Sequence, residues 1–435
     1  MFNVNKIYFY FTFLLILGLF SCKKDVDTKG PEIKFNTPVE NQTFNVNSYV
    51  TVNATVTDEN KISAVSISLL DASQNFAHIT VPVSVSSPSM TFNVNYLLDN
   101  IHLESGLYYI KIMASDGEND SQKFQKIYLI AVPKALKTIY LVSSVGAAQT
   151  NLSVIDTNFS AITPYHTFSG DYLSSSISSY HQQAYMCGNF TGNFTGHVLD
   201  YNSPKFTVAP IVSSNPYFTG YCSSDRDAYV ARYDGTIKGY NYAGGIFYGA
   251  ISLSGCYAQQ MCFNDGYLIA EEKEIMTGTK KLVTYFPTGS VEKNCSLSQD
   301  VVSFCEMDVA DVFVFGNVGG QATIELFDRI NNNLWSPYPF ALASGSLLSA
   351  LRIDSDTYLL GHSNGTIYKY QYSSSSVTAY LTGYTAIKLK YDAVQNKLYV
   401  VEANRVTTFN LTTLGLVNTI NSTETIQDLH LLYNR

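Results

Sequence analysis

The chain has 435 residues, of which 46% are hydrophobic and only 14% are charged, and its formal net charge is −8. This composition excludes disorder over most of the length, because disordered chains combine low hydrophobicity with high charge. The negative charge argues against nucleic acid as the main partner, since phosphate binding requires clustered Lys and Arg. With 33 Tyr, 25 Phe and one Trp, and no long stretch of helical periodicity, the composition predicts an all-β protein.

The first element is an apolar run from Ile7 to Phe20, preceded by Lys6. It is shorter than the roughly 20 residues that span a bilayer, and it suits the core of a signal peptide. The run ends in LFSC (19–22), which resembles the lipobox of bacterial lipoproteins. The resemblance implies a signal peptide over residues 1–21 and a lipid on Cys22, which would anchor the chain to a membrane. The alternative is an ordinary secretory signal in which the cysteine occurs by chance.

The next segment, KKDVD (23–27), lies in a polar tether over residues 22–30. It resembles in part the Lys-plus-acidic tag that exports lipoproteins to the cell surface in the Bacteroidetes. The resemblance implies a lipoprotein of the cell envelope, anchored in the outer membrane. Whether it faces the periplasm or the cell surface stays open.

Residues 31–133 form a set of strands that alternate apolar and polar side chains, as in a sandwich with one buried and one wet face. We expect these strands over residues 32–38, 49–58, 62–71, 106–117 and 122–133. The length fits an immunoglobulin-like β-sandwich. The segment resembles the disulfide-free Ig-like modules that follow the lipid anchor in Bacteroidetes lipoproteins. Its first strand would start at one pole and its last would end at the other, so we expect it to act as a spacer.

Two acidic loops of this domain would lie at one pole of the sandwich. Their carboxylates are candidate calcium ligands, because calcium prefers oxygen ligands. The alternative, which we favour, is that Asp, Asn and Gly here simply form turns. The candidate ligands are Asp58, Glu59, Asp116, Glu118 and Asp120.

The remaining residues, 134–435, contain a repeat in which an aromatic residue opens an apolar strand, and a turn and a second strand follow. Seven such aromatic anchors occur 38 to 46 residues apart: Tyr140, Tyr185, Tyr229, Tyr267, Phe313, Tyr358 and Tyr399. This period, with several short strands per unit, is typical of β-propeller blades.

The two ends of the repeat region complement each other. The unit at Tyr140 lacks a strand before its anchor, whereas the final segment 426–434 has the pattern of such a strand with no blade after it. We therefore predict seven blades, with the C-terminal strand completing the first and removing exposed sheet edges. The pattern resembles quinoprotein-like propellers, and it carries no family-specific catalytic motif.

Seven cysteines occur, and six remain if Cys22 carries lipid. An even number in an exported protein is compatible with disulfides. Cys256 and Cys262, and likewise Cys295 and Cys305, would straddle a connection between blades, while Cys187 and Cys222 would lie on neighbouring blades. The alternative is six free thiols, since several of these residues fall on innermost strands.

No catalytic, phosphate-binding, dinucleotide-binding or metal-ligating motif occurs, so we expect no cofactor and no metal in the propeller. Propellers bind ligands at a channel mouth, through the connections between blades and the turns between middle strands. Aromatic side chains there would suit stacking on sugars or packing against a protein partner. The alternative is that these side chains pack between blades. The candidate ligand face comprises Tyr172, Tyr217, Arg232, Tyr233, Tyr257, His362 and Tyr384.

These observations favour a non-catalytic binding or scaffold lipoprotein whose propeller presents a recognition face to a protein or glycan. One alternative is an exported enzyme acting on polysaccharide, a lyase or hydrolase, which would need acids and bases converging at the channel mouth. A structural envelope component is a third. Fold alone does not decide between them.

Overall fold

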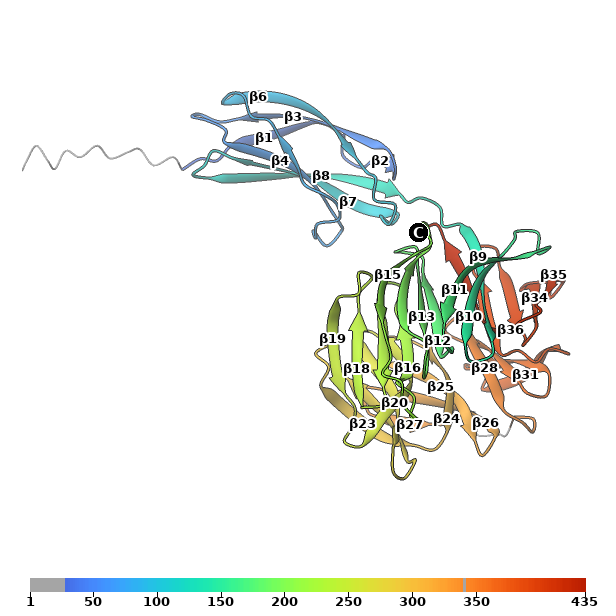
Figure 1. Cartoon of the computed structure of the whole chain (residues 1–435). Coiled ribbons are helices and arrows are strands. Elements are labelled where there is room, and N and C mark those ends of the chain that lie inside the picture. Colours follow the sequence, from blue (N-terminus) through green and yellow to red (C-terminus); the bar gives the residue numbers. More distant parts are fainter. Residues whose placement is uncertain (1–27, 339–341) are drawn as a thin grey trace, which may run out of the picture. The chain divides into compact units, whose positions relative to one another are not determined.

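The computed structural model describes residues 28–338 and 342–435 (Figure 1). The signal peptide, Cys22 and the KKDVD segment lie outside the described residues. Within the described part every regular element is a β-strand, which confirms the all-β prediction. No helix in that part is long and apolar enough to cross a membrane. The chain forms two compact units, one ending at Pro133 and the other running from Lys134 to Arg435.

The first unit is a β-sandwich of two sheets. One sheet has the order β1 (Glu32–Thr37), β3 (Tyr49–Thr57) and β6 (Ser89–Leu97). The other has the order β2 (Gln42–Asn45), β8 (Asp120–Ile130), β7 (Gly106–Ser115), β4 (Ala64–Leu70) and β5 (Val81–Val83). The five expected strands correspond to β1, β3, β4, β7 and β8, and the Ig-like prediction is confirmed.

Alternation along the strands builds the core of this sandwich. On β3, every second residue is fully buried, namely Val50, Val52, Ala54 and Val56, while the residues that alternate with them are exposed or half-buried. On β7, Ile110 and Ile112 are buried in the same cluster. One core therefore lies between the two sheets, as period-2 patterning requires.

The second unit is a ring of seven four-stranded blades, two of which are joined into one eight-stranded sheet. The first strand of each blade contacts the first strands of its neighbours, which places these strands innermost. The strands of blades 2 to 4, from the inside outward, are as follows: β12 (Ser174–Ser178), β13 (Gln183–Cys187), β14 (Phe194–Val198) and β15 (Ser203–Val208); β16 (Phe218–Ser223), β17 (Ala228–Arg232), β18 (Thr236–Tyr240) and β19 (Ile246–Ile251); β20 (Cys256–Asn264), β21 (Tyr267–Glu274), β22 (Lys280–Tyr285) and β23 (Val291–Leu297).

Blades 5 to 7 repeat this plan. Their strands, in the same sense, are β24 (Asp300–Glu306), β25 (Asp311–Val318), β26 (Gln321–Asp328) and β27 (Asn333–Trp335); β28 (Leu347–Arg352), β29 (Thr357–His362), β30 (Thr366–Gln371) and β31 (Ser376–Thr382); β32 (Lys388–Asp392), β33 (Lys397–Val401), β34 (Arg405–Asn410) and β35 (Leu416–Asn421).

Blade 1 closes the ring by strand exchange. Its inner strand is β36 (Thr425–Tyr433), at the end of the chain, and it pairs antiparallel with β9 (Leu136–Val145). The blade is completed by β10 (Gln149–Ile155) and β11 (Ile162–Ser169). The seven-bladed prediction and its closure by the C-terminal strand are thus confirmed (Figure 1).

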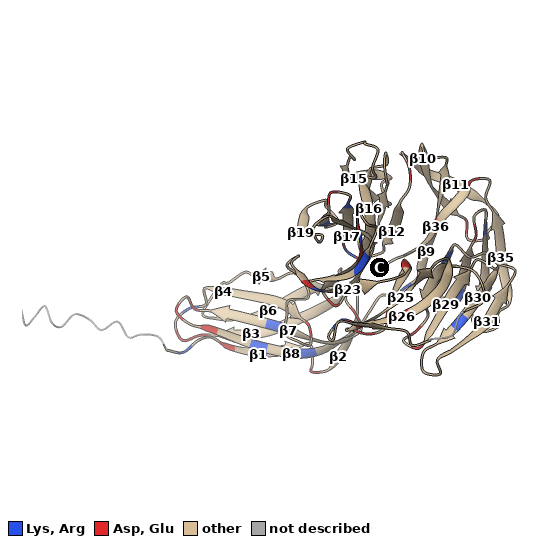
Figure 2. Cartoon of the chain, turned by 90° about the horizontal axis from the view of Figure 1, so that it is seen from below, with Lys and Arg blue, Asp and Glu red and all other residues tan. Residues whose placement is uncertain are grey.

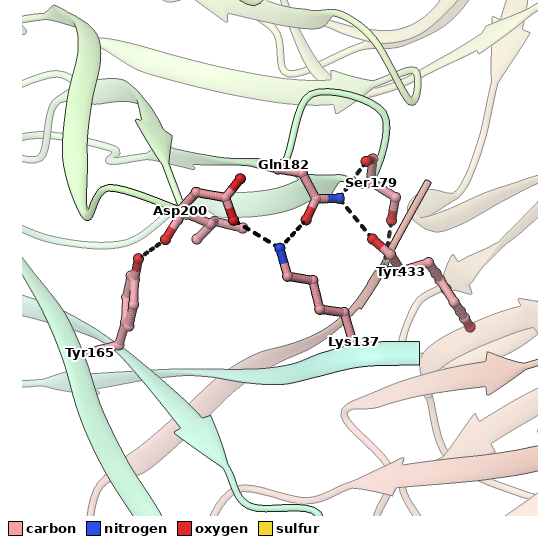
Figure 3. Close-up of polar contacts among 7 residues, drawn as sticks. Lys137, Tyr165, Ser179, Gln182, Asp200 and Tyr433 are labelled. Atoms are coloured by element: carbon pink, nitrogen blue, oxygen red, sulfur yellow. Dashed lines mark hydrogen bonds and ion pairs between the residues drawn. The ribbon is translucent and has the colours of Figure 1, made fainter. Parts of the chain in front are cut away.

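A polar network ties this closure to blade 2 (Figure 3). The Lys137 ammonium on β9 donates to Gln182 Oε1 and to Asp200 Oδ1, both at 2.8 Å. Gln182 in turn donates to the carbonyl of Tyr433 at 2.8 Å, and the amide of Tyr433 donates to Ser179 Oγ at 3.0 Å. Both ends of the propeller segment are therefore held to one corner of the neighbouring blade.

The propeller core consists of seven clusters, one between each pair of adjacent blades. Six of the seven aromatic anchors are buried in these clusters. The fourth, Tyr267, differs because it stands at the first position of β21 and is only half-buried. There the Arg329 guanidinium lies 3.7 Å from its ring centroid, and Leu268 takes the buried position.

All six propeller cysteines are free thiols in this structure. Cys222, Cys262 and Cys305 lie on the innermost strands β16, β20 and β24. The expectation that Cys256 and Cys262 straddle a connection between blades is wrong, because both lie on β20. Six residues of extended strand place their Cα atoms roughly 20 Å apart, too far for a disulfide.

Candidate functional site

Four of the seven candidate ligand residues come together at one corner of blades 3 and 4. Tyr217 lies in the connection before β16, Arg232 ends β17, Tyr233 starts the turn after it, and Tyr257 is the second residue of β20. All four side chains are half-buried. We call these four residues the aromatic–arginine cluster.

The cluster is continuous from ring to ring. The Arg232 guanidinium lies 5.1 Å from the centroid of the Tyr217 ring, a cation–π distance. The amide of Tyr233 donates to the Tyr217 carbonyl at 3.2 Å. The rings of Tyr233 and Tyr257 follow, with centroids 4.9 Å apart and planes inclined by 39°. Burial and the neighbouring Tyr233 raise the pKa of Tyr257, so its hydroxyl stays protonated.

An Asp-Gly turn between the middle strands positions this cluster. Gly235 has φ +83°, a conformation that L side chains rarely adopt, and its amide donates to the Arg232 carbonyl at 3.0 Å. Its carbonyl accepts from Ser252 in the connection to blade 4 at 2.8 Å. The turn of blade 3 is thereby fastened to the connection that leads into Tyr257.

The charge of Arg232 is not neutralised within the described chain. Among residues 28–338 and 342–435 no carboxylate lies within 4.0 Å of its guanidinium, and its side-chain partner is the Tyr240 hydroxyl at 3.4 Å. Lys, Arg, Asp and Glu are sparse along the propeller strands (Figure 2). A cation on a tyrosine platform is thus left available to a partner.

Tyr384 belongs to a similar pair on blade 7. The Arg405 guanidinium lies 5.6 Å from its ring centroid. Here, however, Glu402 Oε2 accepts from Arg405 at 2.5 Å, and Glu402 Oε1 accepts the amide of Thr385 at 3.1 Å. This arginine is neutralised, and the pair fastens the turn of blade 7 to the connection before it.

Tyr172 and His362 do not join the aromatic–arginine cluster. The Tyr172 hydroxyl hydrogen-bonds Ser175 Oγ at 2.9 Å, and burial raises its pKa well above the ordinary value. His362 is fully buried, and its Nδ1 accepts the amide of Asn364 at 3.2 Å within the turn. Contact of either residue with a ligand stays a prediction.

Two of the five acidic candidates of the Ig-like domain, Asp58 and Asp116, accept hydrogen bonds from their own loops. The two loops share one pole, as expected, since the Ser63 amide donates to the Ser115 carbonyl at 2.7 Å. Asp58 Oδ1 accepts two amides of its own loop. Backbone hydrogen bonds from Asn119 and Glu118 lower the pKa of Asp116. No three His, Cys, Asp or Glu side chains within the described ranges gather in a geometry that would hold a metal ion.

A charged network that sequence reasoning missed joins the innermost strands of blades 7, 1 and 2. The Lys390 ammonium lies 2.9 Å from Asp428 Oδ1, and His430 Nε2 lies 3.8 Å from Asp428 Oδ2. His430 Nε2 also hydrogen-bonds Ser175 Oγ at 2.7 Å. We call Lys390, Asp428, His430 and Ser175 the inner-strand network. Its signal in the sequence is the alternation of charges in KLK (388–390) and DLH (428–430).

Burial and charge set the protonation of this network. Burial raises the pKa of Asp428, but Lys390, His430 and Lys388 outweigh it and bring the pKa to about 2. Burial lowers the pKa of His430 to about 4, although Asp428 opposes this shift. At neutral pH Asp428 is therefore ionised and the imidazole of His430 is neutral.

A buried acid, Glu271, lies near Tyr257 of the aromatic–arginine cluster. The charge of Glu271 contributes to the raised pKa of Tyr257. Burial raises the pKa of Glu271 itself, and the Lys280 ammonium, 3.3 Å from Glu271 Oε1, opposes that shift. A carboxyl with a raised pKa is what general acid catalysis uses. Glu271 is only 2% exposed and already paired, so we assign it to the packing of blade 4.

Comparison with known proteins agrees with this architecture. A protein-family model described as a bacterial Ig domain matches residues 31–112. No curated protein matches the chain.

Three solved structures illustrate the likeness. A functionally unknown protein from Desulfotomaculum acetoxidans DSM 771 has 10% identity and a TM-score of 0.50, over 68% of this chain and 99% of that one. A quinoprotein alcohol dehydrogenase-like protein from Bacteroides thetaiotaomicron VPI-5482 has 12% identity and a TM-score of 0.46, over 94% and 100%. The WD40 β-propeller domain of Doa1 has 13% identity and a TM-score of 0.46, over 60% and 85%. At these identities the likeness concerns the fold alone.

Proposed function

We propose that this chain is a membrane-anchored envelope lipoprotein whose propeller binds a protein or glycan through the aromatic–arginine cluster. The observation that carries the proposal is the unneutralised Arg232 on the ring of Tyr217, continued by Tyr233 and Tyr257. Tyr and Arg are enriched at binding hot spots, where large side chains give contact area at low entropic cost. The free cation favours a partner that bears a carboxylate at this contact.

The anchor and the spacer complete the proposal. Cys22 would carry the lipid, and the tether would lead to the start of β1 at one pole of the sandwich. Strands β1 and β8 begin beside each other at this first pole, where Gly30 lies against Ser121. Strand β8 therefore ends at the opposite pole. An Ig-like domain of this topology would hold the propeller away from the membrane.

Fractionation of cells tests the anchor. Cys22→Ser should move the chain from the membrane fraction to the soluble envelope fraction, because the acylated sulfur is lost. Protease treatment of intact cells, with a periplasmic protein as control, then reports which side of the outer membrane the propeller faces. Unchanged membrane association of the Cys22→Ser chain would contradict the lipoprotein assignment.

Retention of envelope material by the immobilised chain tests the binding face. Tyr257→Ala should reduce the retained protein or glycan at least tenfold, as expected for a hot-spot aromatic. The matched control is Tyr201→Ala, which removes a tyrosine that is 83% exposed on blade 2. Equal retention by both variants would contradict the assignment of the face, and turnover of a retained polysaccharide would contradict a non-catalytic role.

A further inference from the structure

A groove of about 330 Å³ lies at the seam where the ring closes, between blade 1 and blade 7. One wall is formed by β9, β10 and β11, and the other by β35 and the loop that leads from it into β36. We call it the seam groove. Its volume falls within the range of small-molecule sites, roughly 300 to 1,000 Å³, and it lies on other blades than the aromatic–arginine cluster.

The floor of the groove carries a hydroxyl without a protein partner. Ser153 on β10 is only 5% exposed, and its side chain has no hydrogen-bond partner within the described part of the chain. The Ser153 Oγ atom opens into the groove, where water or a ligand hydroxyl can hydrogen-bond it. Across the groove, the side chains of Asn421 and Thr423 are exposed and make no hydrogen bond to described residues.

A carboxylate is fixed at the end of the groove. Glu424 Oε2 accepts from Ser143 Oγ at 2.5 Å, and the Asn151 amide nitrogen lies 2.9 Å from both carboxylate oxygens. These donors are neutral, and no Lys, Arg or His lies within 4.0 Å of Glu424 among the described residues. The carboxylate is thus oriented by the protein but keeps acceptor capacity for a ligand.

We propose that the seam groove binds a neutral sugar unit. A sugar hydroxyl both donates and accepts, so one ring can give hydrogen bonds to Glu424 and accept them from Ser153, Thr423 and Asn421. An anionic ligand would meet the carboxylate with no cation to offset it. A simple amine would pair with Glu424 but offers no acceptor to the donors of Ser153, Thr423 and Asn421.

A printed array of neutral, anionic and amine-bearing glycans, probed with the full chain, tests this inference. Neutral glycans should be retained, and titration calorimetry with a retained oligosaccharide then gives the affinity. Ser153→Ala removes a hydroxyl that holds no other part of the protein, and it should weaken binding about threefold to tenfold. Thr423→Trp places a large ring in the groove from an exposed loop position and should weaken binding more.

The matched control is Thr385→Trp, at an exposed threonine in the corresponding loop between blades 6 and 7. It should leave the affinity unchanged. Retention of anionic or amine-bearing glycans only, or an affinity that Thr423→Trp leaves unchanged, would overturn the inference. Loss of sugar binding in Tyr257→Ala but not in Thr423→Trp would also overturn it, while leaving the proposed function in place.

Discussion

The aromatic–arginine cluster and the inner-strand network use similar chemistry in opposite settings. In the cluster, Arg232 lies half-buried on a tyrosine ring with its charge unmatched. In the network, the charges of Lys390 and Asp428 are paired at 2.9 Å, and Asp428 is buried. A buried pair is costly to break because the remaining charge loses its partner, whereas removal of a half-buried cation that has no carboxylate partner leaves no charge unpaired. Pairing and burial, rather than residue type, therefore distinguish a group that stabilises the closed ring from one that is available to a partner.

The largest effect on stability should come from removing the buried carboxylate. Asp428→Asn leaves the Lys390 ammonium without its partner between blades 7 and 1, and it should lower the free energy of unfolding by roughly 3 kcal/mol. Urea unfolding followed by the fluorescence of Trp335, the single tryptophan, reports this change, since Trp335 lies on β27 of blade 5. Retention of partner by the folded fraction should stay unchanged. A loss below 0.5 kcal/mol would show that the network does not hold the seam.

Acidification should weaken the network in a defined range of pH. The pKa of His430 is about 4 in the folded chain, below its ordinary value near 6.5, so the unfolded chain binds the proton first as the pH falls. The stability it contributes is full above pH 6.5 and is lost as the pH falls toward 4, by on the order of 3 kcal/mol. Burial also lowers the pKa values of His166 and His197, which therefore act in the same direction.

His430→Gln is the matched variant for this pH effect. It removes the titrating group, so the slope of unfolding free energy against pH between 6.5 and 4 should become shallower than in the unmodified chain. The remaining slope would come from His166, His197 and the carboxyl groups. An unchanged slope would show that the pKa of His430 is the same in the folded and the unfolded chain.

The smallest effect should come from the neutralised arginine of blade 7. Glu402→Gln removes the charge that pairs with Arg405, a partly exposed contact, and should lower stability by only about 0.5 kcal/mol. The variant also turns blade 7 into a copy of the blade 3 arrangement, with a free arginine on a tyrosine. If the free charge is what attracts a partner, retention of carboxylate-bearing material should rise slightly in this variant, and a fall would contradict that idea.

Much of the fold is predictable from the sequence because the same pattern of strands recurs seven times, so an irregular residue in one repeat does not hide the period. Seven anchors at similar spacing predicted the ring, and the unmatched first and last units predicted its closure. In the sandwich, which has no repeat, β2 and β5 have only four and three residues and give little periodic signal. Strand β6, SMTFNVNYL, was missed although its alternation is visible in the sequence.

The site was predictable only in part, for a geometric reason. In any propeller blade, the connection from the preceding blade and the turn between the two middle strands lie on the same face of the ring. For this reason the sequence could predict that Tyr217, Arg232, Tyr233 and Tyr257 share a face. Which side chains touch depends on how neighbouring blades pack, so the exclusion of Tyr172 and His362 was not visible. The inner-strand network joins β32, β36 and β12, and the seam groove lies between β9–β11 and β35 with the loop before β36, which are segments far apart in the sequence. Their contacts require the closed ring.

The most direct test of the account measures binding and unfolding together in two variants, Arg232→Ala and His430→Gln. We predict that Arg232→Ala weakens retention of the partner about thirtyfold, the effect typical of a hot-spot residue. The urea midpoint and its pH dependence should stay unchanged. His430→Gln should change the pH dependence of unfolding and leave retention unchanged. Full retention by a folded Arg232→Ala chain would contradict the claim that the aromatic–arginine cluster is the recognition face.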